Sequence, residues 1–274
     1  SLQHPRDTNN VFGFVKDSFP DRWGRLLLDR RERLMAQSEG RSKRQLTNYD
    51  YLVGIEDFTR MGGIRYKTDD SDDYINASQR YLVPPIESLR DLCDACHEIE
   101  LAEERNELPE QRWLDQLIDP GTSLGGARPK ANVIDADGKL FVAKFPSKKD
   151  LENTELLEHF AHSLAASAGI NVAKTHTIKI SRDRDLLLSE RFDRSADGKR
   201  IHFASAMSLL GLEDGAGSST GNGYLDIVDF ILQGCTDVKQ NLRELYRRVA
   251  FNIMFGNTDD HFRNHGFLLT PKGW

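Results

Sequence analysis

Apolar positions in the first 118 residues recur at the spacing of amphipathic helices. Asp21 follows Pro20 and precedes a periodic segment that runs to about residue 37, so it is placed as the N-cap of a helix. Further helices are expected at about 86–104 and 109–117. The sequence Asp119-Pro120-Gly121 follows and predicts the end of this helical, loop-rich region.

Beyond this break the pattern changes to short apolar runs that are typical of strands. Two such runs, 131–134 and 140–145, flank Asp135-Ala136-Asp137-Gly138, which predicts a β-hairpin. Two more strands are expected at 175–180 and 186–189. The sheet is therefore expected to be antiparallel at least where the hairpin forms it.

Helices are expected between and after these strands. One runs over about 151–168 and ends at Gly169, which serves as its C-cap. Two others, at about 224–233 and 238–255, follow a glycine- and serine-rich loop at 214–223, and the remainder of the chain is expected to be mainly helical. The apolar side of the helix at about 151–168 consists of Leu156, Leu157, Phe160, Ala161 and Leu164.

The composition is that of an ordinary globular protein. With 274 residues, the chain can form one large domain or two smaller ones. A net charge of −6 argues against a general nucleic-acid surface, and no apolar run reaches the roughly 18 residues of a membrane helix, so no membrane partner is expected. Three cysteines indicate a reducing cytoplasm rather than a disulfide framework.

Two interpretations apply to Cys93-Asp94-Ala95-Cys96-His97. The spacing matches covalent haem attachment, which also requires export, and no export signal is visible. The alternative is a buried helix face, and we favour it because the cysteines continue a helical apolar pattern. That pattern comprises Leu89, Leu92, Cys93, Cys96 and Ile99.

The most informative segment is Gly256-Asn257-Thr258-Asp259-Asp260-His261-Phe262-Arg263-Asn264-His265, directly after a predicted helix. Asp259 and Asn264 have the Asp-x-x-x-x-Asn spacing that protein-kinase-type phosphotransferases use. In such a loop the aspartate accepts the proton of the attacking hydroxyl, and the asparagine holds a magnesium ion on the phosphates. The match alone is weak and depends on companion motifs upstream.

A glycine-containing loop precedes the predicted hairpin. Its sequence is Ser123-Leu124-Gly125-Gly126-Ala127-Arg128-Pro129-Lys130. Gly125, Gly126 and the following Ala127 allow backbone amides to approach phosphate oxygens. A tight turn into a strand explains the same residues equally well.

Two further residues and one segment complete the set. Lys144 lies on a predicted strand and could bind ATP phosphates or simply point to solvent, and Glu155 on the next helix could pair with it. The strand that ends at Ser189 continues into Glu190-Arg191-Phe192-Asp193-Arg194. In a bilobal kinase this segment is the hinge that binds the adenine edge; otherwise it is a polar strand exit with one core aromatic.

Together these motifs resemble the HipA-like serine/threonine kinases, the toxins of bacterial toxin–antitoxin pairs. Ser-Leu-Gly-Gly-Ala-x-x-Lys, Val-Ala-Lys-Phe-Pro, Glu-Arg-Phe-Asp-Arg and Gly-Asn-Thr-Asp-Asp-His-x-x-Asn occur in that order. Phe12-Gly13 and the segment Asp17 to Arg25 are similar to the N-terminal subdomain of that family. The resemblance covers nearly the whole chain.

The resemblance implies an α+β, bilobal protein-kinase-like fold with a family-specific N-terminal subdomain and a mainly helical C-lobe. Residues 1–118 would form the subdomain, 119–190 the kinase N-lobe, and 191–274 the hinge and a partial C-lobe with the catalytic loop. ATP and Mg²⁺ would be the cofactors. The roles implied are catalytic base for Asp259, magnesium ligand for Asn264, phosphate contact for Lys144, hinge for Glu190 and Phe192, and autophosphorylation for Ser123.

The resemblance also implies partners. A small helix-turn-helix antitoxin would bind the protein and carry the DNA contacts, so that DNA is reached only indirectly. The protein substrate could be an aminoacyl-tRNA synthetase. Phosphorylation of Ser123 would place almost two negative charges where ATP phosphates must lie, and would switch the kinase off.

One departure from the family pattern concerns the second metal-binding aspartate, which should follow the catalytic loop and has no counterpart before Trp274. Ser1 is not an initiator methionine. We therefore expect a chain truncated at both ends, and a 274-residue piece that is catalytically feeble.

Three other functions fit part of the pattern. A small-molecule phosphotransferase shares the Asp-x-x-x-x-Asn spacing. A catalytically inactive or truncated kinase fold could serve as a binding module for an antitoxin–DNA complex. A metallohydrolase could use the ligand-rich cluster of Asp259, Asp260, His261 and His265, although no second motif completes it.

Overall fold

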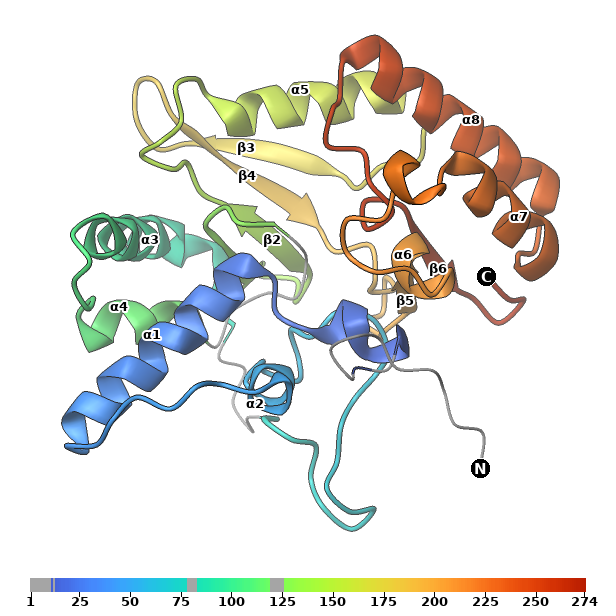
Figure 1. The fold of residues 1–274 in the computed structure, drawn as a ribbon. Helices are drawn as coiled ribbons and strands as arrows, with labels where there is room; N and C mark the ends of the chain where they lie inside the picture. Colours follow the sequence, from blue (N-terminus) through green and yellow to red (C-terminus); the bar gives the residue numbers. More distant parts are fainter. Residues whose placement is uncertain (1–10, 12, 78–82, 119–125) are drawn as a thin grey trace.

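The computed structural model describes residues 11, 13–77, 83–118 and 126–274. The chain folds as a mixed α+β structure, as the sequence predicts (Figure 1). Its centre is a four-stranded antiparallel sheet in the order β1-β2-β4-β3. The strands are β1 (Lys130–Ile134), β2 (Leu140–Lys144), β3 (Thr175–Lys179) and β4 (Asp185–Glu190), each within one or two residues of its expected position.

The two faces of the sheet are covered by different helices. Figure 1 shows α1 (Arg22–Ser38), α3 (Leu89–Glu104) and α4 (Gln111–Ile118) on one side and α5 (Thr154–Ser167) on the other. Side chains alternate along a strand, and the first face packs into one hydrophobic core with α1, α3 and α4. Its members include Trp23, Leu27, Leu92, Cys96, Ile99, Leu114, Val133, Phe141, Ala143 and Leu188.

Both cysteines of the Cys-x-x-Cys-His segment lie in this core. Cys93 and Cys96 are buried on α3, which confirms the interpretation as a packed helix face. Burial raises the pKa of the Cys93 thiol to about 11, and burial also raises that of Cys96. These thiols are therefore protonated at neutral pH and inert as ligands or nucleophiles.

Helix α5 packs on the sheet with only part of its surface. It begins after Asn153, whose side chain accepts a hydrogen bond from the Leu156 amide, and it contacts β3 and β4. Its apolar side, however, is not covered by the described residues. Leu156, Leu157, Phe160 and Leu164 are all exposed.

A second, smaller core lies in the carboxyl-terminal part. It joins α6 (Ala206–Leu209), α7 (Tyr224–Gly234) and α8 (Val238–Phe255) with the residues that follow α8. Its members are Ala206, Met207, Ile227, Ile231, Leu245 and Phe262. The short elements η1 (Gly13–Ser18), α2 (Asn48–Val53), η2 (Ile86–Ser88) and η3 (Ser218–Thr220) complete the helices of the described part.

A two-stranded antiparallel sheet was not predicted. It pairs β5 (His202–Ser205) with β6 (Gly266–Leu269), in a region expected to be mainly helical. Each strand has only four residues, and about 60 residues separate them, so neither carries a local strand pattern. The pairing brings the segment after α8 next to the segment that leaves the first sheet.

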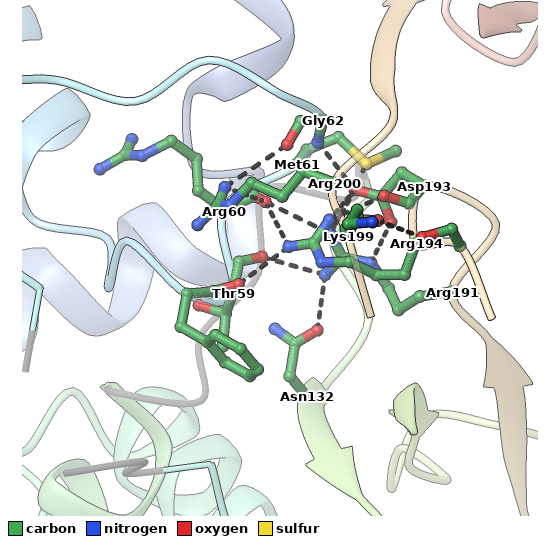
Figure 2. Close-up of polar contacts among 12 residues, drawn as sticks. Thr59, Arg60, Met61, Gly62, Asn132, Arg191, Asp193, Arg194, Lys199 and Arg200 are labelled. Atoms are coloured by element: carbon green, nitrogen blue, oxygen red, sulfur yellow. Dashed lines mark hydrogen bonds and ion pairs between the residues drawn. The ribbon is translucent and has the colours of Figure 1, made fainter. Parts of the chain in front are cut away.

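The segment that leaves β4 is fixed by a buried polar network (Figure 2). Asp193 is fully buried and accepts hydrogen bonds from Arg191 (Nε 2.6 Å and Nη2 2.6 Å), Arg194 (Nη1 2.8 Å) and the Gly62 amide (2.7 Å). Arg191 also donates to the Asn132 side chain at 2.8 Å. The network thus joins the N-terminal segment, β1 and the exit of β4.

The same network fixes the backbone of the N-terminal segment around Arg60. Arg191 donates to the Thr59 carbonyl at 3.0 Å, and Arg194 donates to the Phe58 and Arg60 carbonyls at 2.8 and 3.1 Å. Burial alone would raise the pKa of the Asp193 carboxyl, but Arg191 and Arg194 lower it to about 2. The carboxylate is therefore ionised throughout the neutral range.

No helix within residues 11, 13–77, 83–118 and 126–274 is both long and apolar enough to cross a lipid bilayer.

Replacing Asp193 by alanine should lower the free energy of unfolding by about 3–5 kcal/mol, because Arg191 and Arg194 would stay buried without a counter-charge. Chemical denaturation at neutral pH measures this. Asp197→Ala is the matched control, since that carboxylate pairs with Lys199 at the surface and should change stability little. Equal effects of the two variants would contradict the structural role of the network.

Low pH should remove the stability that the ionised Asp193 contributes. The folded pKa of Asp193 lies near 2 against an ordinary value of 3.8, so its stabilisation is complete above about pH 4 and is lost as the pH falls towards 2. The stability difference between the parent and Asp193→Asn should therefore shrink over that window. Denaturation curves at several pH values measure it, and a constant difference would contradict the assigned pKa.

Candidate active site

A large open cleft of about 2180 Å³ lies between the first sheet and the carboxyl-terminal core. Its walls come from the N-terminal segment, the start of β1, the end of β2, the exit of β4 and the loop after α8. Among the residues singled out from the sequence, those that line it are Gly126, Ala127, Lys144, Phe192, Asp259 and Asn264. Residues more than 130 positions apart in the chain thus share one cavity.

Four residues of the expected site do not line the cleft or cannot be placed. Ser123 and Gly125 lie outside the described residues. Glu155 is buried beneath the cleft wall, and Glu190 forms an ion pair with Lys139 at 2.7 Å. The side chain of Glu190 is therefore held at the sheet, although its backbone leads directly to Phe192.

The loop that carries Asp259 and Asn264 begins where α8 ends. Gly256 terminates the helix with a left-handed backbone (φ 73°), and its amide donates to the carbonyls of the last turn. Asn264 Nδ2 donates to the Asp259 carbonyl at 2.6 Å, which closes the loop. The Asp259 side chain is 86% exposed, so its carboxylate projects into the open cleft.

The carboxylate of Asp260 has the opposite environment. It is almost buried and accepts hydrogen bonds from Tyr224 Oη (2.5 Å), Asn252 Nδ2 (2.8 Å) and His265 Nε2 (2.8 Å). Because a carboxylate only accepts, His265 carries its proton on Nε2. Sequence reasoning assigned Asp260 only to the metallohydrolase alternative, since no spacing signal connects it with residues on α7 and α8.

The pKa values of this group follow from its partners. Burial alone would raise the pKa of Asp260, but the Tyr224 hydroxyl and the neighbouring His265 and Asn252 lower it. Burial lowers the pKa of His265 despite Asp260, and burial together with the bond to Asp260 raises the pKa of Tyr224 to about 12. At neutral pH the group therefore consists of the ionised Asp260 carboxylate and three neutral donors, Tyr224, Asn252 and His265.

The hairpin register places two lysines at the edge of the cleft. Lys130 lies directly opposite Lys144 at the end of the β1–β2 pair. Like charges directly opposite each other on a sheet are unfavourable. Each lysine is therefore stabilised by a carboxylate of its own. Lys130 Nζ donates to Asp21 at 2.6 Å, and Lys144 Nζ donates to Glu158 at 2.5 Å.

The expected pairing of Lys144 with Glu155 is wrong. Glu155 lies in the first turn of α5, where its buried carboxylate accepts from Arg128, which also binds Asp150. Glu158 is three residues further along, close to one helical turn, and this position reaches Lys144. The cap at Asn153 sets the helix start and hence which glutamate faces the strand, which spacing alone does not reveal.

The N-terminal segment holds the glycine-containing loop from outside. Asp21 caps α1 through the Gly24 amide at 2.7 Å and simultaneously binds Lys130 in a buried ion pair. The Trp23 amide donates to the Gly126 carbonyl at 3.4 Å. Burial lowers the pKa of Lys130 even though Asp21 favours its charged form. Gly126 thus lies between the start of α1 and the lysine pair.

Phe192 forms an apolar wall of the cleft. Its ring packs against Phe203 on β5, with centroids 5.4 Å apart, and it remains 44% exposed towards the cavity. Gly266 on β6 has no room for a side chain because the Phe203 ring fills that space. The two strands therefore support the aromatic pair.

The metallohydrolase alternative is not supported by the geometry. Within the described part of the chain, no three His, Cys, Asp or Glu residues are grouped so as to hold a metal ion. The His265 Nε2–H is already donated to Asp260. Asp259 and Asn264 instead offer two oxygen-bearing side chains to the cleft that Lys144 also lines.

Gly126, Lys144, Asp259 and Asn264 thus line one cleft, and Lys144 pairs with a glutamate of α5. The family model of the HipA-like C-terminal domain matches residues 122–274, which is more than half of the chain. The chain belongs to the HipA-like C-terminal domain family.

Known proteins similar to this chain include kinases. It is 25% identical over 187 residues to a putative kinase of Haemophilus influenzae, covering 61% of this chain and 54% of that protein. It is 26% identical over 187 residues to the serine/threonine-protein kinase toxin HipA of Shewanella oneidensis, covering 59% and 43%. The chain spans about half the length of the curated relatives it matches.

The fold also matches a solved structure. The HipA chain of Shewanella oneidensis MR-1, in its complex with HipB and operator DNA, superposes with a TM-score of 0.62. Sequence identity is 20%, and the match covers 95% of this chain and 61% of that chain. The similarity therefore includes the N-terminal segment as well as the residues of the family model.

Replacing Glu158 by alanine should weaken Mg–ATP binding about fivefold, because Lys144 loses the carboxylate that orients it in a half-exposed ion pair worth up to ~1 kcal/mol. Glu155→Ala should instead leave the affinity for Mg–ATP nearly unchanged, because Glu155 contacts Arg128 and not Lys144, and Arg128 keeps its ion pair with Asp150. Nucleotide titration and denaturation, applied to both variants, separate the two roles. Weaker Mg–ATP binding in Glu155→Ala than in Glu158→Ala would instead indicate that Glu155 is the partner of Lys144.

Proposed function

We propose that this protein is an ATP- and magnesium-dependent serine/threonine protein kinase of the HipA toxin type. The observation that carries the proposal is the single cleft lined by Gly126, Lys144, Asp259 and Asn264. Membership of the HipA-like family supports it. The spacing of Asp259 and Asn264 in the chain is the spacing that kinases use for the catalytic aspartate and the metal-binding asparagine.

In this proposal Asp259 is the catalytic base. Its exposed carboxylate accepts the proton of the substrate hydroxyl while that oxygen forms a bond to the γ-phosphorus and the bond to the ADP leaving group breaks. Lys144, oriented by Glu158, binds the α- and β-phosphates. The backbone amides at Gly126 and Ala127 approach the phosphates from the opposite side.

Asn264 fits the role of a magnesium ligand. Its amide nitrogen is engaged by the Asp259 carbonyl, so its carbonyl oxygen is the atom directed to a cation, and oxygen is the ligand that magnesium prefers. When bound, the metal ion would neutralise negative charge that develops on the phosphates. Phe192 would pack against the adenine, whose edge would bind the backbone that follows Glu190.

We also propose a bilobal division of the chain. Residues 1–118 form the N-terminal subdomain, 119–190 the kinase N-lobe, and 191–274 the hinge and the part of the C-lobe with the catalytic loop. Ser123 in the phosphate loop is the proposed autophosphorylation site. We further propose a helix-turn-helix antitoxin as partner, as HipB is for HipA of Shewanella oneidensis, and a translation component such as an aminoacyl-tRNA synthetase as substrate.

Asp259→Asn should reduce phosphoryl transfer by about 10²–10⁴-fold and leave Mg–ATP affinity nearly unchanged, because the base is removed and the phosphate contacts remain. Intact mass and phosphosite mapping after incubation of the full natural protein with Mg–ATP measure the transfer. Asp229→Asn, on the exposed side of α7, is the control and should behave as the parent.

Phosphate on Ser123 in the parent and its absence in Asp259→Asn would support both the kinase activity and the role of Asp259. ATP binding without phosphate transfer in any variant would contradict the proposal. That result would favour the alternative function, in which a catalytically inactive kinase fold binds an antitoxin–DNA complex.

A further inference from the structure

Residues of the catalytic loop alternate between two environments. Asp259, His261, Arg263 and Asn264 are directed outwards, whereas Asp260, Phe262 and His265 are wholly or largely buried. The outward residues line the cleft and offer the chemistry. The inward residues connect the loop to the rest of the molecule, so they determine where the outward residues stand.

Asp260 is the inward residue with the most diverse contacts. Its three donors come from different parts of the chain: Tyr224 is the first residue of α7, Asn252 lies in the last turns of α8, and His265 directly precedes β6. Oδ2 accepts from Tyr224 and Asn252, and Oδ1 accepts from His265. One side chain therefore ties α7, α8 and the strand entry to a single point of the loop.

The other inward contacts hold the far end of the same loop. Phe262 packs in the second core, and its carbonyl accepts from the Met207 amide at 3.2 Å. The His265 carbonyl accepts from the Ala206 amide at 2.7 Å. Near Asp259 the loop is held from two sides. The Asn257 amide donates to the Asn252 carbonyl of α8 at 2.9 Å, and the Asp260 carboxylate ties the following residue to α7, α8 and the entry of β6.

We propose that Asp260 is a positioning residue, which holds the backbone next to Asp259 so that the Asp259 carboxylate and the Asn264 amide face the same phosphoryl group. This rests on the proposed kinase function. It assigns Asp260 a role different from its neighbour, although both are aspartates in the same motif. Tyr224 takes part as a donor, which couples the start of α7 and the preceding glycine-rich segment to the catalytic loop.

The test compares Asp260→Asn, Tyr224→Phe and the control Asp229→Asn in the full natural protein. An asparagine at 260 has the same shape, but it presents a single acceptor oxygen where the carboxylate has two, so it cannot satisfy all three donors. Tyr224→Phe removes one donor and leaves the carboxylate in place. Melting temperature shows whether each variant remains folded.

Two readouts are measured on these variants. The first is amide hydrogen exchange of the peptide that spans 256–266, which should become faster in Asp260→Asn and, to a smaller extent, in Tyr224→Phe. The second is steady-state kinetics with Mg–ATP, in which kcat should fall about 100-fold for Asp260→Asn while KM for ATP changes less than about twofold. A purely structural role would slow the reaction only in proportion to unfolded protein.

Faster exchange confined to the loop, with the loss in kcat, supports the proposal. Unchanged exchange in that peptide overturns it, whatever the activity. Faster exchange with parental kcat also overturns it, because the loop position would then not matter for transfer. If the parent itself transfers no phosphate, the proposed function fails, and the exchange result alone decides whether Asp260 holds the loop.

Discussion

A fully buried ion pair between Arg191 and Asp193 lies where the chain leaves the first sheet and continues towards the second core. Removing two charges from water is costly unless every donor and acceptor finds a partner. Here the partners are backbone carbonyls around Arg60, the Gly62 amide and the Asn132 side chain. The pair can persist only if the N-terminal segment, β1 and the exit of β4 keep their relative positions, and these elements form the walls of the cleft.

Buried carboxylates with polar partners also occur around the cleft. Asp21 binds Lys130, Arg128 binds Glu155, and Asp260 receives three donors, all with little exposure of the carboxylates. These carboxylates are held away from solvent by fixed partners, and Glu155 Oε2 alone among their oxygens is buried without a hydrogen-bond partner in the described part of the chain. The groups assigned to chemistry are more accessible: the Asp259 side chain is 86% exposed, and Lys144 is partly exposed in its ion pair with Glu158. The buried polar contacts thus fix the backbone segments that present the accessible groups to the cleft.

The sequence predicted the longer helices and the four main strands well, because each carries a local hydrophobic pattern, whereas the short helices α2 and α6 were not predicted. The pair β5–β6 was missed because each strand is short and its partner is distant in the chain. Periodicity also shows that α5 has an apolar face, but it does not show whether another element covers that face. Asp259 and Asn264 were singled out by their spacing and Lys144 by its place on a predicted strand. The partner of Lys144 and the three donors to Asp260 depend on the actual helix start and on contacts between distant segments, which the sequence does not show.

The central claim is that this cleft binds a nucleotide with its phosphates between Lys144 and Asn264. A crystal structure with magnesium and a non-hydrolysable ATP analogue tests it most directly. We expect the phosphates to contact Lys144 and the Gly126 loop, the metal ion to contact Asn264, and the adenine to lie against Phe192. A nucleotide bound elsewhere, or phosphates that contact neither Lys144 nor Asn264, would contradict the account.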